Sequence, residues 1–160
     1  MSITPPQGPR VKGTAFRGVI QALEVLRGQA VVEQCQSLMP DDLAAAFRYK
    51  TLLASGFYPI EWYRELLWSV RAATGDGDRL LFEIGRESAR CDMTGVYRTV
   101  FKLISPQIAL SLASRMFSNY YDCGQCRIEE SRSNFALAKW SECKGFNRDL
   151  WIEVFGSCSM

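Results

Sequence analysis

Four cysteines in the last quarter of the chain could bind a metal ion or exchange electrons. Two residues separate Cys123 from Cys126, the spacing of half a tetrahedral zinc site or of a redox pair. Cys143 and Cys158 could supply the other two thiolates, but fourteen residues lie between them, so the second half of the zinc signature is missing. Three interpretations stay open for these four residues: a zinc site, a redox dithiol, or inert buried thiols.

Six aromatic residues in two separate segments could line a ligand pocket. They are Tyr58, Trp62, Tyr63, Phe117, Tyr120 and Tyr121. Ligand pockets are mostly apolar with a few polar groups, and tyrosine supplies both. The alternative is ordinary core packing, because aromatic residues at helical spacing are mainly a core signal.

The chain contains no histidine among its 160 residues. This excludes catalysis by Ser-His-Asp or Cys-His groups and excludes His-ligated haem. The carboxylates show no catalytic arrangement either. Glu129 and Glu130 are adjacent on an expected strand and point to opposite faces, whereas Glu83 and Glu87 lie one helical turn apart among arginines. We therefore expect no enzyme and no resident cofactor, with cysteine-bound zinc as the alternative.

Composition places the chain among soluble globular domains. Nineteen basic and seventeen acidic residues give a net charge of +2. The sequence has no run of Lys and Arg residues, so we expect no nucleic-acid partner. The uncharged stretch between Lys102 and Arg115 is broken by Pro106 and is too short to cross a membrane. The N-terminus lacks the features of a secretory signal, so we expect a cytoplasmic protein.

The elements that position these residues are mainly helical. Residues 1–10 include three of the six prolines and are expected to form a flexible tail before one domain over 11–160. Apolar residues then repeat at helical spacing, first from Val11 to Leu26 and again after Asp41, Pro59 and Asp78. Further helices are expected around 96–104, after the Ser105-Pro106 start signal, and after the predicted cap Asn147.

One region changes to the two-residue period of strands. Residues 126–130 alternate, 131–134 form a turn and 135–140 continue as a second strand, which predicts an antiparallel hairpin. An isolated hairpin is marginal in water and must pack on helices. The predicted fold is therefore α+β, with a mostly helical layer packed on a small antiparallel sheet.

Several short segments resemble an uncharacterised, paralogue-rich protein family typical of myxobacteria. These segments are residues 11–16, 55–63, 105–107, 117–122 and 145–151. That family is similar in layout to the 4-vinyl reductase domain, the haem-NO-binding-associated fold and TRAPP-like subunits. The resemblance implies a helical layer over a small sheet, often dimeric, which binds small hydrophobic molecules or partner proteins. No catalytic residues are established for that family, so the resemblance assigns none to this chain.

Two details of the resemblance bear on the site and on assembly. The 4-vinyl reductase domain often carries a cysteine just before its last helix, and Cys143 occupies that position in this sequence. This similarity favours a metal site at the cysteines. Related chains continue into further strands, whereas this sequence ends at Met160, so its record is truncated or its sheet is smaller. A missing hairpin would leave an open strand edge, which favours pairing with another chain.

We therefore expect a non-enzymatic domain that binds or senses a small apolar ligand or a protein partner. Two alternatives remain open. One is a cysteine-ligated zinc or thiol redox sensor, and the other is a structural module that forms a homodimer.

Overall fold

The computed structural model describes residues 8–92 and 105–159. The body of the molecule contains two short strands and six helices. These are β1 (Arg10–Lys12), α1 (Gly13–Arg27), α2 (Gln29–Ser37), α3 (Asp41–Arg48), β2 (Phe57–Pro59), α4 (Ile60–Thr74), α5 (Asp78–Asp92) and α8 (Arg148–Cys158). The helix expected around 96–104 lies outside the described residues, as does most of the expected tail. Pro9 and Arg10 are hydrogen-bonded into the body, because the Pro9 carbonyl accepts from Ile60 and Arg10 pairs with Pro59.

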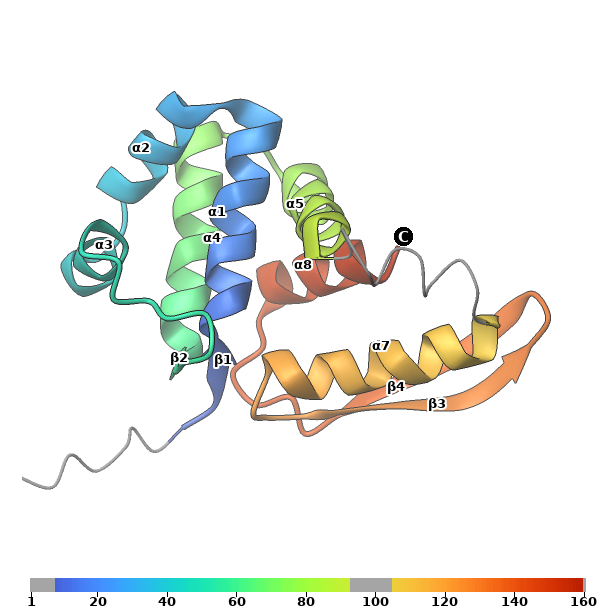
Figure 1. Cartoon of the computed structure of the whole chain (residues 1–160). Coiled ribbons are helices and arrows are strands. Elements are labelled where there is room, and N and C mark those ends of the chain that lie inside the picture. Colours follow the sequence, from blue (N-terminus) through green and yellow to red (C-terminus); the bar gives the residue numbers. More distant parts are fainter. Residues whose placement is uncertain (1–7, 93–104, 160) are drawn as a thin grey trace, which may run out of the picture.

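Between α5 and α8 the chain forms a separate substructure, which we call the arm. It consists of α7 (Pro106–Tyr120), β3 (Gln125–Arg132) and β4 (Phe135–Ser141). Figure 1 shows α7 running along the β3–β4 ribbon, on the far side of α8 from α1 and α4. The predicted α+β class is confirmed, although the strands form two separate antiparallel pairs, β1 with β2 and β3 with β4.

The predicted hairpin is confirmed in position and direction. Gln125 pairs with Ser141 at its open end and Arg132 with Phe135 at its turn. A bulge lies between Ile128 and Glu130, so one residue of β3 has no partner on β4. Such an extra residue increases the local twist of a ribbon.

The local start signals of two helices are also confirmed. The Ser105 side chain accepts from the Ile108 N–H with Pro106 at the first helical position, and Asn147 accepts from the Leu150 N–H at 3.0 Å. Before α3, however, the cap position is Pro40, and Asp41 and Asp42 lie within the first turn. Negatively charged side chains in the first turn still stabilise the helix, because they lie near the positive end of its dipole.

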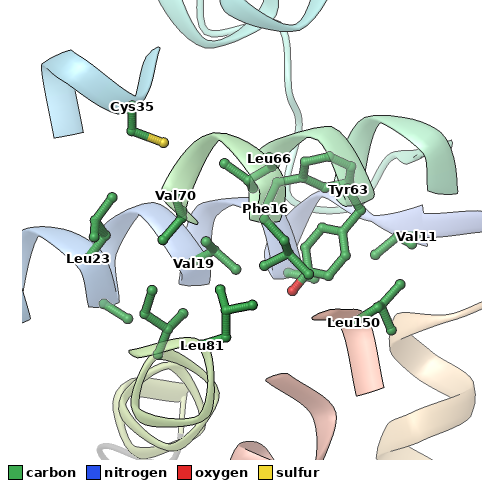
Figure 2. Packing of buried hydrophobic residues seen from close by; sticks show 14 of the residues in the cluster. Val11, Phe16, Val19, Leu23, Cys35, Tyr63, Leu66, Val70, Leu81 and Leu150 are labelled. Atoms are coloured by element: carbon green, nitrogen blue, oxygen red, sulfur yellow. The ribbon is translucent and has the colours of Figure 1, made fainter. Parts of the chain in front are cut away.

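The hydrophobic core lies between α1, α4, α5 and α8. Figure 2 shows Phe16, Val19 and Leu23 of α1 packed against Tyr63, Leu66 and Val70 of α4, with Leu81 and Leu150 closing the cluster from α5 and α8. Cys35 of α2 is fully buried at its edge, and burial raises the pKa of this thiol to about 12. Among the helices that the structure describes, none has the length and apolar character needed to cross a bilayer.

Candidate functional site

The six predicted pocket residues separate into two groups. Tyr58 and Trp62 stack on each other, with ring centres 6.2 Å apart and planes inclined by 7°. The Tyr58 hydroxyl accepts from the Leu53 N–H at 2.7 Å and donates to the Thr51 carbonyl at 3.0 Å. This pair therefore fixes the connection between α3 and β2 to the body.

The other four, Tyr63, Phe117, Tyr120 and Tyr121, gather where α4, the end of α7 and α8 meet. Phe117 and Tyr121 lie 5.0 Å apart between ring centres, and Tyr121 continues to Phe146 at 4.9 Å. Tyr63 packs edge-on against Phe16 at 5.0 Å. An isolated bridge between Val11 and Tyr121 and the ion pair of Arg10 with Asp122 hold this end of the arm against β1.

We call this region, with α8 beside it, the seam. Its aromatic side chains continue from Phe146 to Trp151, and Trp151 meets Trp140 of β4 and Phe155 of α8. The seam thus joins the arm to the body through large rings, which have a strongly favourable free energy of burial.

Glu153 is a buried carboxyl at the centre of the seam, and only 5 % of its surface is exposed. Its Oε1 accepts from the Ser157 hydroxyl at 3.3 Å, while its Oε2 is buried and has no hydrogen-bond partner among the described atoms. The hydroxyls of Tyr63 and Tyr121 point toward the carboxyl closely enough to lower its pKa as weak donors, but neither reaches the geometry of a hydrogen bond to Oε2. Figure 2 shows the Tyr63 hydroxyl pointing toward the side of the core on which α8 lies.

Burial raises the pKa of Glu153 to about 7, and the Ser157, Tyr63 and Tyr121 hydroxyls only partly oppose this rise. Burial, followed by the charge of Glu153, in turn holds the pKa values of Tyr63 and Tyr121 well above the usual range. The third phenol, Tyr120, donates a short hydrogen bond to Asp92. Burial and then this bond raise the pKa of Tyr120.

Within residues 8–92 and 105–159, the titratable groups that influence Glu153 are all acids. Tyr63 comes from α4, Tyr120 and Tyr121 from the end of α7, and Cys158 from α8, while α5 contributes the backbone around Gly85. No Lys or Arg in the described part of the chain contributes to the pKa of Glu153. The seam can therefore be neutral or negative, and it attracts a proton, a cation or a hydrogen-bond donor.

The four predicted metal ligands lie close to the seam but are not gathered around one point. Cys123 and Cys143 stand at the open end of the ribbon, Cys126 pairs with Trp140, and Cys158 ends α8. Each is a free thiol. In residues 8–92 and 105–159, which include all four cysteines, no three carboxyl or thiol side chains converge as a metal ion would require.

Burial raises the pKa of each of these thiols. The value reaches about 11 for Cys123, where Asp122 and Cys143 add to the effect of burial. It also reaches about 11 for Cys158, whose sulfur is partly covered near Cys126 and Glu153 although the residue as a whole is exposed. Thiols with raised pKa values are poor nucleophiles at neutral pH, unlike the activated thiols of redox enzymes.

The acidic pairs weighed in the sequence are engaged in surface ion pairs. Glu83 accepts from Arg79, and Glu87 from Arg90. Glu129 lies 3.5 Å from the Lys139 ammonium, and Glu130 pairs with Arg132. These contacts agree with their interpretation as solvated charged faces.

Glu153 is the site residue that sequence reasoning missed. It lies three residues after buried Leu150 and four before Ser157, so a period of 3.6 places it on the core-facing side of α8. The signal was obscured because Trp151, Val154 and Phe155 make the helix apolar on most sides. A charged residue at a core position of a helix is the pattern that would have revealed it.

A separate surface hollow of about 360 Å³ lies on the outer face of α4. Glu61, Arg64, Glu65, Trp68 and Asn147 line it. It contains none of the predicted site residues.

The chain matches no family model, and no curated protein or solved structure is significantly similar to it.

Proposed function

We propose that this chain is a non-enzymatic binding domain that holds a small ligand at the seam. The ligand has an apolar body and one positively charged or N–H-donating group. The observation that carries the proposal is the buried Oε2 of Glu153, which has no hydrogen-bond partner among the described atoms. An unsatisfied buried acceptor costs about 1–3 kcal/mol, and more when it is charged, so a ligand that donates to it gains that free energy.

The surroundings of Glu153 favour a ligand of this class. Phe117, Tyr121, Phe146 and Trp151 offer ring faces and edges, which attract both apolar groups and ammonium groups. Among the residues that the structure describes, no cation neutralises the carboxyl, so the positive charge can come from the ligand. Exposed Phe155 and Cys158 provide an approach from the solvent at the end of α8.

The same groups argue against catalysis. A carboxyl with a pKa of about 7 is suited to general acid–base chemistry. However, the described groups around it include no cation that could stabilise a negative charge developing during a reaction. Binding requires only the arrangement that Glu153 and the aromatic rings already form.

A cytoplasmic location is part of this proposal. Cys35, Cys123, Cys126, Cys143 and Cys158 are free thiols, as is usual in a reducing compartment.

Calorimetry on the full chain tests the proposal, with an alkylammonium and arylammonium series and the matched neutral alcohols as probes. We expect benzylammonium to bind more tightly than benzyl alcohol, and its affinity to increase as Glu153 ionises between about pH 6 and pH 8. Glu153→Gln should weaken benzylammonium binding about tenfold or more, since a charged hydrogen bond is worth roughly 1.5–3 kcal/mol.

Glu24→Gln, on the exposed face of α1, is the matched control and should leave this affinity unchanged. The proposal is wrong if no ammonium probe binds at millimolar concentration, or if Glu153→Gln binds them as well as the natural chain does.

Homodimerisation through β4 is a second candidate, favoured by one observation. Phe135 and Leu137 of β4 are exposed by 50 % and 45 %, and among the described strands β4 pairs only with β3. An exposed apolar edge strand is a template for pairing with another strand, and Lys139 is the only charged residue of β4 that opposes self-pairing. A second copy supplies a matching apolar edge.

Sedimentation velocity tests this candidate. We expect a dimer at micromolar concentration that Leu137→Lys converts to monomer. Leu53→Lys, at a more exposed leucine remote from β4, should leave the dimer intact. A monomeric natural chain across this concentration range would rule the dimer out.

A further inference from the structure

Cys123 and Cys143 face each other at the open end of the β3–β4 ribbon. In the ladder nearest this end, Gln125 pairs with Ser141 and Cys126 with Trp140. If the same antiparallel register is extended by two residues on each segment, Cys123 lies opposite Cys143. Directly opposed residues of antiparallel strands have Cβ atoms about 4.5–5.5 Å apart, close to the separation that a disulfide needs.

Beyond the ladder, Gly124 still lies directly against Cys143. Gly124 and Glu142 occupy the intervening opposed positions, and both have positive φ, +82° and +56°. Both segments therefore depart from the extended conformation at opposed positions, just beyond the last paired residues of the ribbon. A Cβ on residue 124 would lie 2.6 Å from the Cys143 sulfur, so only glycine leaves room for the thiol here.

Each thiol reaches toward the opposite segment. The Cys123 sulfur lies 3.5 Å from the carbonyl oxygen of Lys144, the residue that follows Cys143. The Cys143 sulfur lies 3.4 Å from the Ser141 carbonyl oxygen of its own segment, and the backbone N–H of Gln125 on the opposite strand β3 interacts with the same sulfur. Both residues are half-buried, which leaves them accessible to small reagents.

We propose that Cys123 and Cys143 form a reversible disulfide that closes the base of the ribbon when the protein meets a low-molecular-weight disulfide. This site is independent of ligand binding at Glu153. It also differs from the pairing that the sequence spacing suggested, because the partner of Cys123 is the cysteine across the ribbon and not Cys126.

The exchange takes place in two balanced steps. The Cys143 thiolate, after losing its proton to solvent, attacks one sulfur of the small disulfide, forming a mixed disulfide and releasing one small thiolate. The Cys123 thiolate then attacks the Cys143 sulfur and displaces the second small thiolate. The two cysteines lose two protons and two electrons in total, and the small disulfide gains the electrons.

Cys143 is the favoured first nucleophile because the charge of Asp122 further raises the pKa of Cys123, whereas none of the described carboxylates raises that of Cys143 and the Gln125 N–H opposes its rise. Burial raises the pKa values of both thiols, so the exchange is slow at neutral pH and accelerates as pH rises.

The closed disulfide would join the two ends of the β3–β4 ribbon. Cys123 follows Asp122, which binds Arg10 of β1, and Cys143 precedes Asn147, which caps α8. The bond would enclose β3 and β4 in one covalent loop. We expect amide hydrogen exchange in the ribbon to slow about tenfold or more on oxidation, since a loop of this length strongly restricts opening.

The test treats the full chain with glutathione disulfide at pH 8, blocks free thiols, unfolds the protein and digests it with trypsin. We expect a disulfide between the peptides 116–127 and 140–144, with dithiothreitol restoring the reduced masses. Because the first peptide also contains Cys126, the variant Cys126→Ser identifies the partner and should retain the link. The matched variant Cys123→Ser should lose it.

Circular dichroism on both variants shows that each has folded. Linkage of Cys143 to Cys126, linkage to Cys158, or a glutathione adduct that never closes to an internal disulfide in the natural chain would each overturn the proposal.

Discussion

Gly85 of α5 and Gly156 of α8 each lie directly against the backbone of the opposite helix. A Cβ on Gly85 would lie 2.0 Å from the Glu153 carbonyl oxygen, and one on Gly156 would lie 2.1 Å from the Phe82 carbonyl oxygen. The two helices therefore cross at a separation that no larger residue allows. This crossing fixes the position of α8, and with it the position of Glu153 in the core.

The first prediction concerns this crossing. Gly85→Ala should destabilise the protein by about 3 kcal/mol, because the methyl group forces two backbones apart and disturbs the packing of α8. Gly156→Ala should have a similar effect. Chemical denaturation measures both changes in the free energy of unfolding.

Gly77→Ala is the control for the glycine variants, because a Cβ at Gly77 meets no atom within 4 Å and its φ is not positive. It should be neutral or slightly stabilising, since alanine restricts the unfolded chain. A change of less than about 1 kcal/mol for both Gly85→Ala and Gly156→Ala would contradict the close crossing.

The second prediction is the pH dependence that Glu153 imposes. Its pKa rises from an ordinary 4.5 to about 7 in the folded chain, so the folded state holds the proton more tightly than the unfolded state does. The resulting stabilisation is complete below about pH 4.5 and is lost as pH rises through 7. The loss amounts to roughly 3 kcal/mol in the free energy of unfolding.

Glu153→Gln should remove this pH dependence, because the amide stays neutral at every pH. We expect the variant to be more stable than the natural chain at pH 8 and similar to it at pH 5, as measured by urea unfolding across that range. Glu24→Gln, on the exposed face of α1, should preserve the natural slope. If Glu153→Gln also kept that slope, the carboxyl would not be titrating in this range.

Features decided by neighbouring residues were predictable from the sequence. The Ser105 and Asn147 caps depend on three or four consecutive residues, and the hairpin was visible in the alternation that begins at Cys126. Strand β1 was missed because it has only three residues, and its apolar Val11 extends the helical pattern that begins at Gly13.

Features that depend on contacts between distant segments were not predictable. Nothing local to Gly85 or Gly156 indicates that they meet another helix backbone, since the reason lies about 70 residues away in each case. Tyr63 and Tyr121 were predicted to share a site, but their common neighbour Glu153 was missed. The two-residue spacing of Cys123 and Cys126 likewise drew attention away from Cys143, which the hairpin register places opposite Cys123.

The third prediction separates structure from ligand binding at Tyr58. Tyr58→Phe keeps the ring between Phe16 and Trp62 but removes both hydrogen bonds of the hydroxyl, to Leu53 and Thr51. We expect a loss of about 1–2 kcal/mol in the free energy of unfolding and faster amide exchange at Leu53. Ligand affinity at the seam should not change, and a loss of affinity in a folded Tyr58→Phe would place Tyr58 in the binding site after all.

The fourth prediction concerns Trp140, whose indole Nε1 is buried and has no hydrogen-bond partner among the described atoms. Its ring packs edge-on against Trp151 at 6.1 Å and Phe155 at 5.8 Å. Trp140→Phe loses some of this contact area but also removes the unpaired N–H, whose burial costs about 1–3 kcal/mol. Because the two effects oppose each other, we expect the free energy of unfolding to change by less than about 1 kcal/mol.

Trp151→Phe is the matched comparison, because Trp151 contacts three rings, those of Trp140, Phe146 and Phe155, and its indole nitrogen is not among the buried unpaired atoms. This variant loses contact area with no compensating gain, so its loss of stability should exceed that of Trp140→Phe by about 1 kcal/mol or more. Urea unfolding of the two variants side by side measures the difference. A larger loss for Trp140→Phe than for Trp151→Phe would show that the Trp140 N–H is satisfied in solution, for example by a bound water molecule.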